Sequence, residues 1–403
     1  MGWCLTILRS ARPGPPQSHK SRSDRRRRDA RARRGSVLPD SGRPSVPGQP
    51  RKRRRRLQFS LRALFIATAL LAVALIPVAR WAQEKRALES ARAAFGTKSG
   101  ILRGRGGYRV ALQRPSVPWT GEDLAPLRQL HGVQSVQFFQ GEVTADAMAQ
   151  LRNLDTLEEV SFWQTRVPDA GVASLCGLPR LKQLRLYETG VNDAAIERIG
   201  LCPTIEELML SGTNVSDRGL ARARTLCRLR SLYLDRTRVT DAGVGKLVGL
   251  QQLERLGLSN TNVGDAGIEQ LTRVRSLKDL DLSGTRVTDA GLMHVAGMVR
   301  LERLGLEATQ VSDTGVAALP RLRHLRTLNL AKTRITSAGL KPLLASSCSL
   351  RGLNLEGTQV DDSLVPCLEA LPTLRWISIK DTNITPEAGE RLHRSGRNPS
   401  VYY

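Results

Sequence analysis

One unit of 24 residues repeats eleven times, from about Ser135 to the end of the chain. One position of the unit, here called the marker, is a threonine in ten copies and a glycine in the first. The markers are Gly141, Thr165, Thr189, Thr213, Thr237, Thr261, Thr285, Thr309, Thr333, Thr358 and Thr382, so that only the step to Thr358 has 25 residues. A fixed period of this length predicts a solenoid, because each unit is too small to bury its own apolar side chains and must stack on its neighbours.

Each unit reads L-x-x-L-x-L-x-x-T-x-V-x-D-x-G-L, as in residues 277–292. The L-x-L part predicts a short strand with inward-pointing leucines, and stacked units then form a parallel sheet. We expect the marker hydroxyl to hydrogen-bond to the backbone of the turn that follows the strand. The aspartates of the second half stand where a helix begins, and we expect their carboxylates to cap its free N–H groups. They include Asp241, Asp265, Asp289 and Asp313.

This pattern resembles the leucine-rich repeat family over about two thirds of the chain. Within the family it looks most like the cysteine-containing subclass, because V-T-D-A-G-L at residues 287–292 matches the second half of that repeat, although Thr replaces its Cys or Asn. The resemblance implies an α/β fold, a solenoid with parallel strands on its concave face and helices on its convex face. In eukaryotes that subclass often follows an F-box, but no F-box-like helical segment lies between Trp81 and Leu130.

The first 56 residues hold 18 Lys and Arg against 3 acidic residues, whereas the other 347 residues hold 44 against 34. Such a segment buries too little apolar surface to order itself, which predicts a disordered basic tail. Three interpretations stay open: a cytoplasmic tail that lies on anionic lipid, a start codon assigned too far upstream, or nucleic-acid binding. Nucleic acid as a partner is the least favoured of the three, because no aromatic stacking residues are interleaved with the charges.

Residues 63–79 are uncharged and mostly apolar, which is close to the length that a bilayer-spanning helix needs. An uncleaved anchor is favoured over a cleaved signal peptide, because Arg80 and Trp81 interrupt the small residues of a cleavage site. A buried soluble helix fits less well, since the segment is apolar on all sides. The basic residues before it predict a cytoplasmic N-terminus and extracytoplasmic repeats.

The predicted domains follow from these features. Residues 1–56 form the disordered tail, 57–81 the transmembrane anchor, 82–100 a juxtamembrane helix and linker, 101–132 an N-terminal cap, and 133–403 the leucine-rich repeats. Gly96 is expected to end the juxtamembrane helix. In the cap, Tyr108, Val110 and Leu112 alternate as in an edge strand.

The candidate binding site lies where aromatic residues gather on the expected concave face. Two residues before the marker, the first three repeats carry Phe139, Trp163 and Tyr187, which predicts a stacked column on neighbouring strands. Tyr233 lies further along, and Gln183 and Arg185 flank the column. The column is interpreted either as an anchor patch for a protein, peptide or sugar partner or as a core covered by residues 101–118.

The remaining polar positions point to structure more than to chemistry. Arg255, Asp279 and Arg303 alternate in sign on adjacent strands, which predicts an ion-paired ladder within the sheet. Small residues leave the middle of the concave face smooth, and Trp376 is assigned to the closing cap. These small residues are Ser211, Gly212, Gly257, Ser283, Gly284 and Gly305. The six cysteines show no paired spacing and are expected to be free thiols, with Cys202 in the core.

Catalysis finds no support in the sequence, because the five histidines fall in separate elements and no phosphate loop or metal-ligand spacing occurs. We therefore expect no enzyme, cofactor or metal. The predicted function is a membrane-anchored scaffold in the cytoplasmic membrane that binds a protein or peptide partner, with a glycan as a further candidate ligand, through its concave face. The layout, with 52 Arg against 10 Lys, is similar to that of bacterial envelope proteins. The alternative is a cytoplasmic substrate-binding adaptor of a ubiquitin-ligase-like or effector pathway.

Overall fold

The computed structural model describes residues 61–96, 99–104, 106–346, 349–394 and 399–403. The chain divides into two units, Met1–Leu64 and Phe65–Tyr403, and the repeats belong to the second unit. The predicted basic tail, residues 1–56, lies outside the described residues.

A single long helix, α1 (Leu61–Phe95), runs through both the predicted anchor and the predicted juxtamembrane helix. It ends where expected, at Gly96, whose φ of 76° suits glycine. Its part from Phe65 onwards is long and apolar enough to cross a membrane, with a mean hydropathy of 1.9 in a window that is 0% buried. A signal sequence near the N-terminus can meet the same criteria of length and composition.

The last turns of α1 pack on the N-terminal cap. Ala87, Ala91 and Phe95 are buried, and the Phe95 ring meets Trp119 edge-on at 6.2 Å between centroids. The cap itself comprises β1 (Gly100–Arg103), β2 (Tyr108–Gln113), α2 (Gly121–Leu124) and η2 (Ala125–Gln129). Strand β2 alternates in burial as expected, but β1 pairs with it antiparallel and is the outer strand. The cap therefore contributes two strands to the sheet where one was expected.

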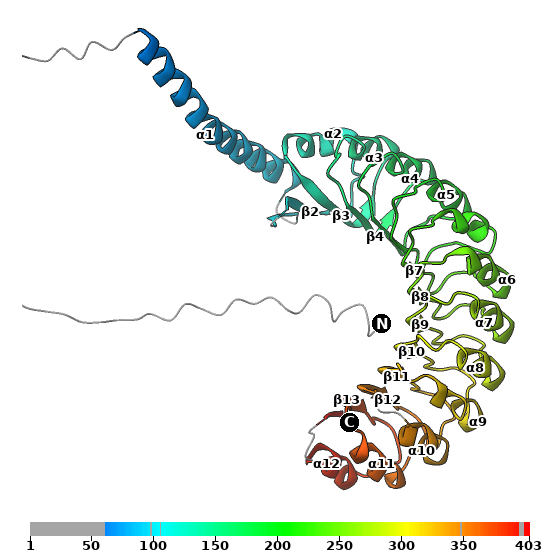
Figure 1. Ribbon diagram of the computed structural model, residues 1–403. Helices are drawn as coiled ribbons and strands as arrows, with labels where there is room; N and C mark the ends of the chain where they lie inside the picture. Colours follow the sequence, from blue (N-terminus) through cyan, green and yellow to red (C-terminus); the bar gives the residue numbers. More distant parts are fainter. Residues whose placement is uncertain (1–60, 97–98, 105, 347–348, 395–398) are drawn as a thin grey trace, which may run out of the picture. The chain divides into compact units, whose positions relative to one another are not determined.

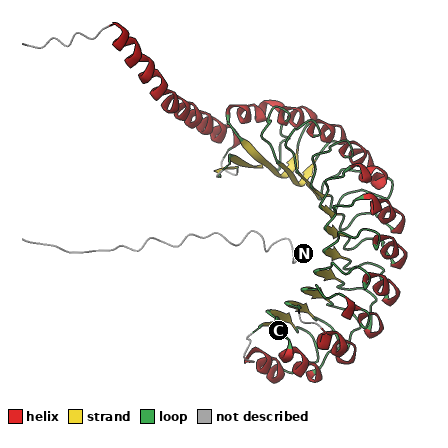
Figure 2. Ribbon diagram, viewed as in Figure 1, coloured by secondary structure: helices red, strands yellow, loops and turns green. Residues whose placement is uncertain are grey.

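The repeats form one sheet whose 14 strands follow one another in chain order, all parallel from β2 onwards. Figures 1 and 2 show the strands side by side along one face of the repeats, with the helices along the opposite face. The fold is thus the predicted leucine-rich repeat solenoid. The repeat strands are β3 (Val133–Glu142), β4 (Glu159–Arg166), β5 (Gln183–Tyr187), β6 (Glu207–Met209), β7 (Ser231–Tyr233), β8 (Arg255–Gly257), β9 (Asp279–Asp281), β10 (Arg303–Gly305), β11 (Thr327–Asn329), β12 (Gly352–Asn354), β13 (Trp376–Ser378) and β14 (Ser400–Tyr402).

Short helices return the chain from the end of each strand to the start of the next. Most have two turns or fewer, because a 24-residue unit leaves no room for more. They are α3 (Ala145–Leu151), α4 (Asp169–Leu175), α5 (Asp193–Ile199), η3 (Gly219–Thr225), α6 (Asp241–Val244), η4 (Gly245–Gly249), α7 (Asp265–Leu271), α8 (Asp289–Val295), α9 (Asp313–Val316), η5 (Leu319–Arg321), α10 (Ser337–Ser346), η6 (Asp362–Leu364), α11 (Val365–Ala370) and α12 (Pro386–Arg394).

The apolar positions of the repeat make one continuous core between strands and helices. In the unit around β9, Leu280, Leu282 and Leu292 are each 0% exposed. Because every unit repeats these positions, the core extends through the whole stack, and each unit buries its leucines against two neighbours.

The marker threonines close the turn after each strand, as predicted. The hydroxyl of Thr285, for example, donates to the carbonyl oxygen of Leu282 at 2.5 Å, and Thr261 does the same with Leu258 at 2.6 Å. The residue before the marker has a φ between 50° and 72° in all eleven repeats, whether it is Gly284, Arg236 or another residue. Left-handed backbone costs about 1 kcal/mol in a residue other than glycine. The turn therefore places this strain in most repeats.

The repeated aspartates act differently from the prediction. Thr240, not Asp241, is the N-cap of α6, and its hydroxyl accepts from the N–H of Ala242. Asp217, at the equivalent position one repeat earlier, instead accepts from the Thr240 N–H at 2.8 Å and from the Thr240 hydroxyl at 2.6 Å. The same pair of bonds joins Asp265 to Thr288. Each carboxylate therefore fastens its own repeat to the next, because the solenoid stacks one helix start directly on another.

Candidate functional site

The aromatic column predicted from the sequence is assembled on the strands of the first repeats. Phe139 pairs in register with Trp163, and Trp163 with Tyr187, across β3, β4 and β5. All three side chains are half-buried. The rings of Trp163 and Tyr187 lie 5.0 Å apart between centroids with a tilt of 42°. We call Phe139, Trp163 and Tyr187 the aromatic shelf.

The N-terminal cap lies beside the aromatic shelf. Gln113, the last residue of β2, pairs in register with Phe139 as the next strand of the sheet. The chain beyond it approaches Gly141, where a Cβ would collide with the carbonyl group of Arg114, and Gly141 has a φ of 88°. This close approach explains why the first marker is a glycine. The cap continues the sheet, and each side chain of the shelf stays partly exposed.

Arg185 is held by other side chains of the sheet. Its guanidinium group lies 2.7 Å from the Glu159 carboxylate on β4 and 2.8 Å from the Glu207 carboxylate on β6. Its remaining terminal nitrogen donates to the side-chain oxygen of Gln183 at 3.0 Å. The two residues that the sequence placed beside the shelf, Gln183 and Arg185, thus form one hydrogen-bonded cluster with the two glutamates, which rigidifies the floor next to the rings.

Sequence reasoning missed Arg236, which reaches the shelf from two repeats away. It donates to the Tyr187 hydroxyl, its guanidinium carbon lies 5.4 Å from the centre of the Tyr187 ring, and it pairs with Glu188 at 2.8 Å. Gln164 donates to the other oxygen of Glu188 at 2.7 Å. The hydrogen bond from Gln164 and the charge of Arg236 hold the pKa of Glu188 below its usual range. The only sequence signal was the position of Arg236 directly before a marker.

Tyr233 does not join the shelf. In the register of the sheet it shares a row with Arg185 and Met209, and Met209 lies between them. Its ring leans over the next strand, where a Cβ at Gly257 would come within 3.0 Å of the Tyr233 Cδ1 atom. Burial raises the pKa of the Tyr233 hydroxyl. The candidate residues therefore occupy two adjacent rows, one with the shelf and one with Arg185 and Tyr233.

The predicted ion-paired ladder is formed only in part. Arg303 holds Asp279 with two nitrogens, at 2.7 and 2.8 Å. Arg255, on the other side of Asp279, instead donates to the Ser231 hydroxyl at 2.7 Å. Of the two arginines beside it, Asp279 therefore pairs with Arg303.

Asp235, in the middle repeats of the sheet, is a carboxylate that was not predicted from the sequence as part of a site. Asp235 accepts from the Ser211 hydroxyl and from the Ser259 N–H, both at 2.9 Å. Burial raises the pKa of Asp235, and the charge of Asp281 adds to this effect, whereas the two hydrogen bonds act against it. Among the described residues, no three His, Cys, Asp or Glu side chains lie together as a metal site.

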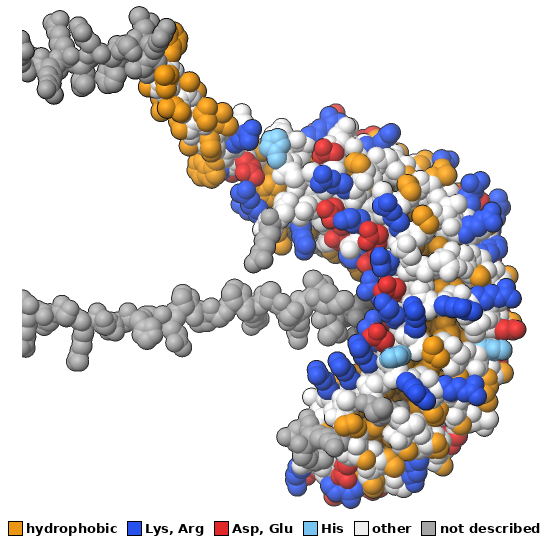
Figure 3. Space-filling model, viewed as in Figure 1, with side chains coloured by type: hydrophobic (Ala, Val, Ile, Leu, Met, Phe, Trp, Pro, Cys, Tyr) orange, Lys and Arg blue, Asp and Glu red, His pale blue; other side chains and the backbone are white. Residues whose placement is uncertain are grey.

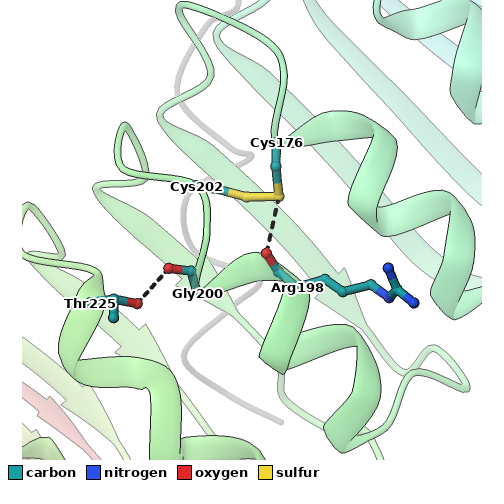
Figure 4. Close-up of a disulfide and its surroundings, with 5 residues drawn as sticks. All are labelled: Cys176, Arg198, Gly200, Cys202 and Thr225. Atoms are coloured by element: carbon teal, nitrogen blue, oxygen red, sulfur yellow. Dashed lines mark hydrogen bonds between the residues drawn. A yellow bond between two sulfur atoms is a disulfide. The ribbon is translucent and has the colours of Figure 1, made fainter.

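The expectation of free thiols is wrong for one pair of cysteines. Cys176, after α4, and Cys202, after α5, form a disulfide with their Cα atoms 4.7 Å apart (Figure 4). The Cys176 sulfur also lies 3.5 Å from the carbonyl oxygen of Arg198. The pairing could not be read from the spacing, because the two residues occupy slightly different positions of neighbouring repeats and meet only when the helices stack. Cys202 is buried as expected.

Comparisons with known proteins agree with this fold. The model of the Leucine Rich repeat family matches residues 275–296 and 321–344. An internalin, InlF, from Listeria monocytogenes is similar in structure, with a TM-score of 0.54 and 20% identity over 73% of this chain and 86% of the internalin. A leucine-rich repeat protein of Leptospira interrogans reaches a TM-score of 0.47 and 17% identity over 69% of this chain and 74% of its own. The comparison with curated proteins finds no match.

The repeat pattern, the sheet, the family model and the likeness to the internalin together support the leucine-rich repeat family. Solenoids of this kind present extended concave surfaces that typically bind other proteins or peptides. That is the class of protein to which the fold and the repeat motif point.

Proposed function

We propose that this chain is a membrane-anchored, non-catalytic leucine-rich repeat protein that binds a protein or peptide partner on its concave face. The aromatic shelf carries the proposal, because Trp163 and Tyr187 present two large, partly exposed rings on a rigid sheet. Aromatic residues and arginine dominate the energy of most protein interfaces, especially where the surrounding groups are already ordered. Arg236 and the cluster around Arg185 provide that order.

The proposed anchor is the apolar part of α1, with the N-terminus in the cytoplasm and the repeats outside it. The disulfide between Cys176 and Cys202 supports this orientation, because disulfides persist in oxidising compartments and are rare in the cytoplasm. It also disfavours the cytoplasmic adaptor as a second function. A bacterial cytoplasmic membrane is the proposed location.

Within the family, we further propose the cysteine-containing subclass on the basis of the V-T-D-A-G-L half-repeat. The aspartate and glycine of this motif act together across repeats. A Cβ at Gly267 would lie 2.5 Å from the Asp241 carboxylate, so the glycine makes room for the aspartate of the repeat before it.

Protease access to a C-terminal tag in intact spheroplasts tests the orientation, with detergent-lysed cells as the control. We expect the tag to be digested without detergent. Protection until lysis would place the repeats in the cytoplasm and overturn this part of the proposal.

The double substitution Trp163→Ala with Tyr187→Ala tests the binding surface. We expect it to abolish capture of the partner and to change the thermal transition little, because both side chains are partly exposed. Tyr402→Ala is a matched control, since that tyrosine is exposed at the other end of the repeats. Phe162→Ala, in the core beneath the shelf, should by contrast cost about 3–5 kcal/mol. A loss of that size in the double variant would show that the shelf is core.

A further inference from the structure

Along one edge of the sheet, just before each strand begins, charges of opposite sign alternate from repeat to repeat. The position lies seven residues before the marker, and neighbouring side chains pair, as Arg230 and Lys278 do with Glu254 at 3.1 and 3.2 Å. The pairs Lys182–Glu158 and Arg326–Glu302 are 3.5 and 2.8 Å apart. In chain order the series is Glu158, Lys182, Glu206, Arg230, Glu254, Lys278, Glu302 and Arg326. The charges of these eight side chains along the edge of the sheet therefore cancel.

The alternation ends at the next two repeats, where the same position is Arg351 and then Arg375. The Arg351 N–H donates to the Arg326 carbonyl at 2.7 Å, and the Arg375 N–H to the Arg351 carbonyl at 2.8 Å, so the three residues are stacked directly. We call Arg326, Arg351 and Arg375 the arginine strip. Strands stand about 4.8 Å apart, and like charges placed opposite each other destabilise a sheet.

Nothing in the described part of the chain neutralises the last two arginines. Neither Arg351 nor Arg375 has a carboxylate within ion-pair distance there, and both are exposed. Residues 347–348 and 395–398, which lie outside the described residues, contain no aspartate or glutamate in the sequence. Figure 3 shows basic side chains gathered over the C-terminal repeats on the face in view.

Trp376 stands beside the strip as the first residue of β13. A Cβ at Gly352 would fall among the Cε2, Cζ2 and Nε1 atoms of the Trp376 ring, so the ring lies on the backbone of the neighbouring strand. The side chain is half-buried; Trp376 directly follows Arg375 in the chain, and its ring lies on Gly352, which directly follows Arg351. The arrangement therefore offers a fixed aromatic surface at the end of a row of positive charges.

We propose that the arginine strip and Trp376 bind an acidic segment of a protein partner in an extended conformation. Arginine recognises carboxylates with two parallel hydrogen bonds, and arginine and tryptophan are the residues most enriched at the centres of protein interfaces. The strip spans about 10 Å, which an extended segment covers with about three to four residues. This surface lies at the opposite end of the repeats from the aromatic shelf, and its assignment is independent of that shelf.

The test uses the full chain in detergent. The probe is an acidic peptide with alternating Glu and Ala and a central benzophenone side chain, and its length of about ten residues is enough to span the strip. Irradiation of the benzophenone cross-links the bound peptide to the protein. Because the basic tail also attracts such a peptide, the protein is then digested with trypsin, and only the adduct on the fragment of residues 376–380 is counted. We expect an adduct there, and Arg351→Glu should lower its yield about tenfold. The thermal midpoint of Arg351→Glu should stay equal or rise, because the substitution restores the alternation of charge.

Arg275→Glu is the matched control, since Arg275 is exposed and the substitution changes the net charge equally. It should leave the yield at residues 376–380 unchanged. An equal loss in both variants, or an equal yield in wild type and Arg351→Glu, would refute the proposal. Unlabelled peptide should also compete for the adduct. If an anionic polysaccharide or single-stranded DNA competes and the unlabelled peptide does not, the strip binds another polymer and the assignment to acidic protein segments is wrong.

Discussion

The contact between Asp217 and the next repeat allows a quantitative test of how the solenoid is held together. Asp217→Ala removes two hydrogen bonds to Thr240, one of 2.8 Å from its N–H and one of 2.6 Å from its hydroxyl. Hydrogen bonds to charged groups contribute about 1.5–3 kcal/mol each when buried, and these are only partly buried. We therefore expect Asp217→Ala to lower the free energy of unfolding by about 2–3 kcal/mol.

Gly243 makes this test sharper because it faces the same carboxylate. In a helix, Gly→Ala ordinarily stabilises by about 1 kcal/mol. Here the added Cβ would collide with Oδ1 of Asp217, with its Cγ at 3.0 Å and its Cα at 3.2 Å. Overpacking of this kind costs about 1–3 kcal/mol, so Gly243→Ala should destabilise the wild-type chain. In the Asp217→Ala background the carboxylate is gone, and the same substitution should cost about 1–3 kcal/mol less.

The assay is urea unfolding of the four chains of this double-mutant cycle, followed by circular dichroism. Glu197→Ala is the matched control, because the Glu197 side chain is 45% exposed and lies 3.9 Å from its ion-pair partner Arg218, and its loss should change stability by less than about 0.5 kcal/mol. A coupling free energy near zero, or a stabilising effect of Gly243→Ala in the wild-type chain, would refute the proposed link between aspartate and glycine.

Three further outcomes follow from single features. Because burial raises the pKa of Asp235 in the folded chain, ionised Asp235 opposes folding above that pKa, and its effect disappears as the pH falls towards the unfolded value. Asp235→Asn should therefore raise the thermal midpoint at pH 7, with a smaller gain at pH values near the unfolded pKa; an equal gain at all pH values would contradict this cause. Ala308 has a φ of 54°, so Ala308→Gly should stabilise the chain by about 0.5–1 kcal/mol in urea unfolding, whereas a destabilising effect would show that the turn carries no strain. Reducing the disulfide between Cys176 and Cys202, 26 residues apart, should cost about 3–4 kcal/mol, and a Cys202→Ser variant should then no longer respond to reductant.

Much of the fold was readable because it is local and repeated. Leu280 and Leu282 lie two residues apart and point to the same side of a strand, and Thr285 closes the turn that follows. The shelf of Phe139, Trp163 and Tyr187 was readable for the same reason, since equal positions of neighbouring repeats must become neighbours in the sheet. Two patterns in the sequence were overlooked, although both are visible once the repeats are aligned: the alternating charges before each strand, and the pairing of each aspartate with the glycine one repeat later.

The sequence by itself determined the period, the order of the strands, the core positions and the row in which the aromatic rings stand. Only the tertiary structure decided how side chains meet across repeats: Cys176 with Cys202, Arg185 between two glutamates, and Arg236 with Tyr187, 49 residues before it. The physical reason is that backbone periodicity depends on properties that each repeat has alone. Contacts between long side chains depend instead on the offset of one repeat from the next and on which charges already have partners, and neither is written in any single unit.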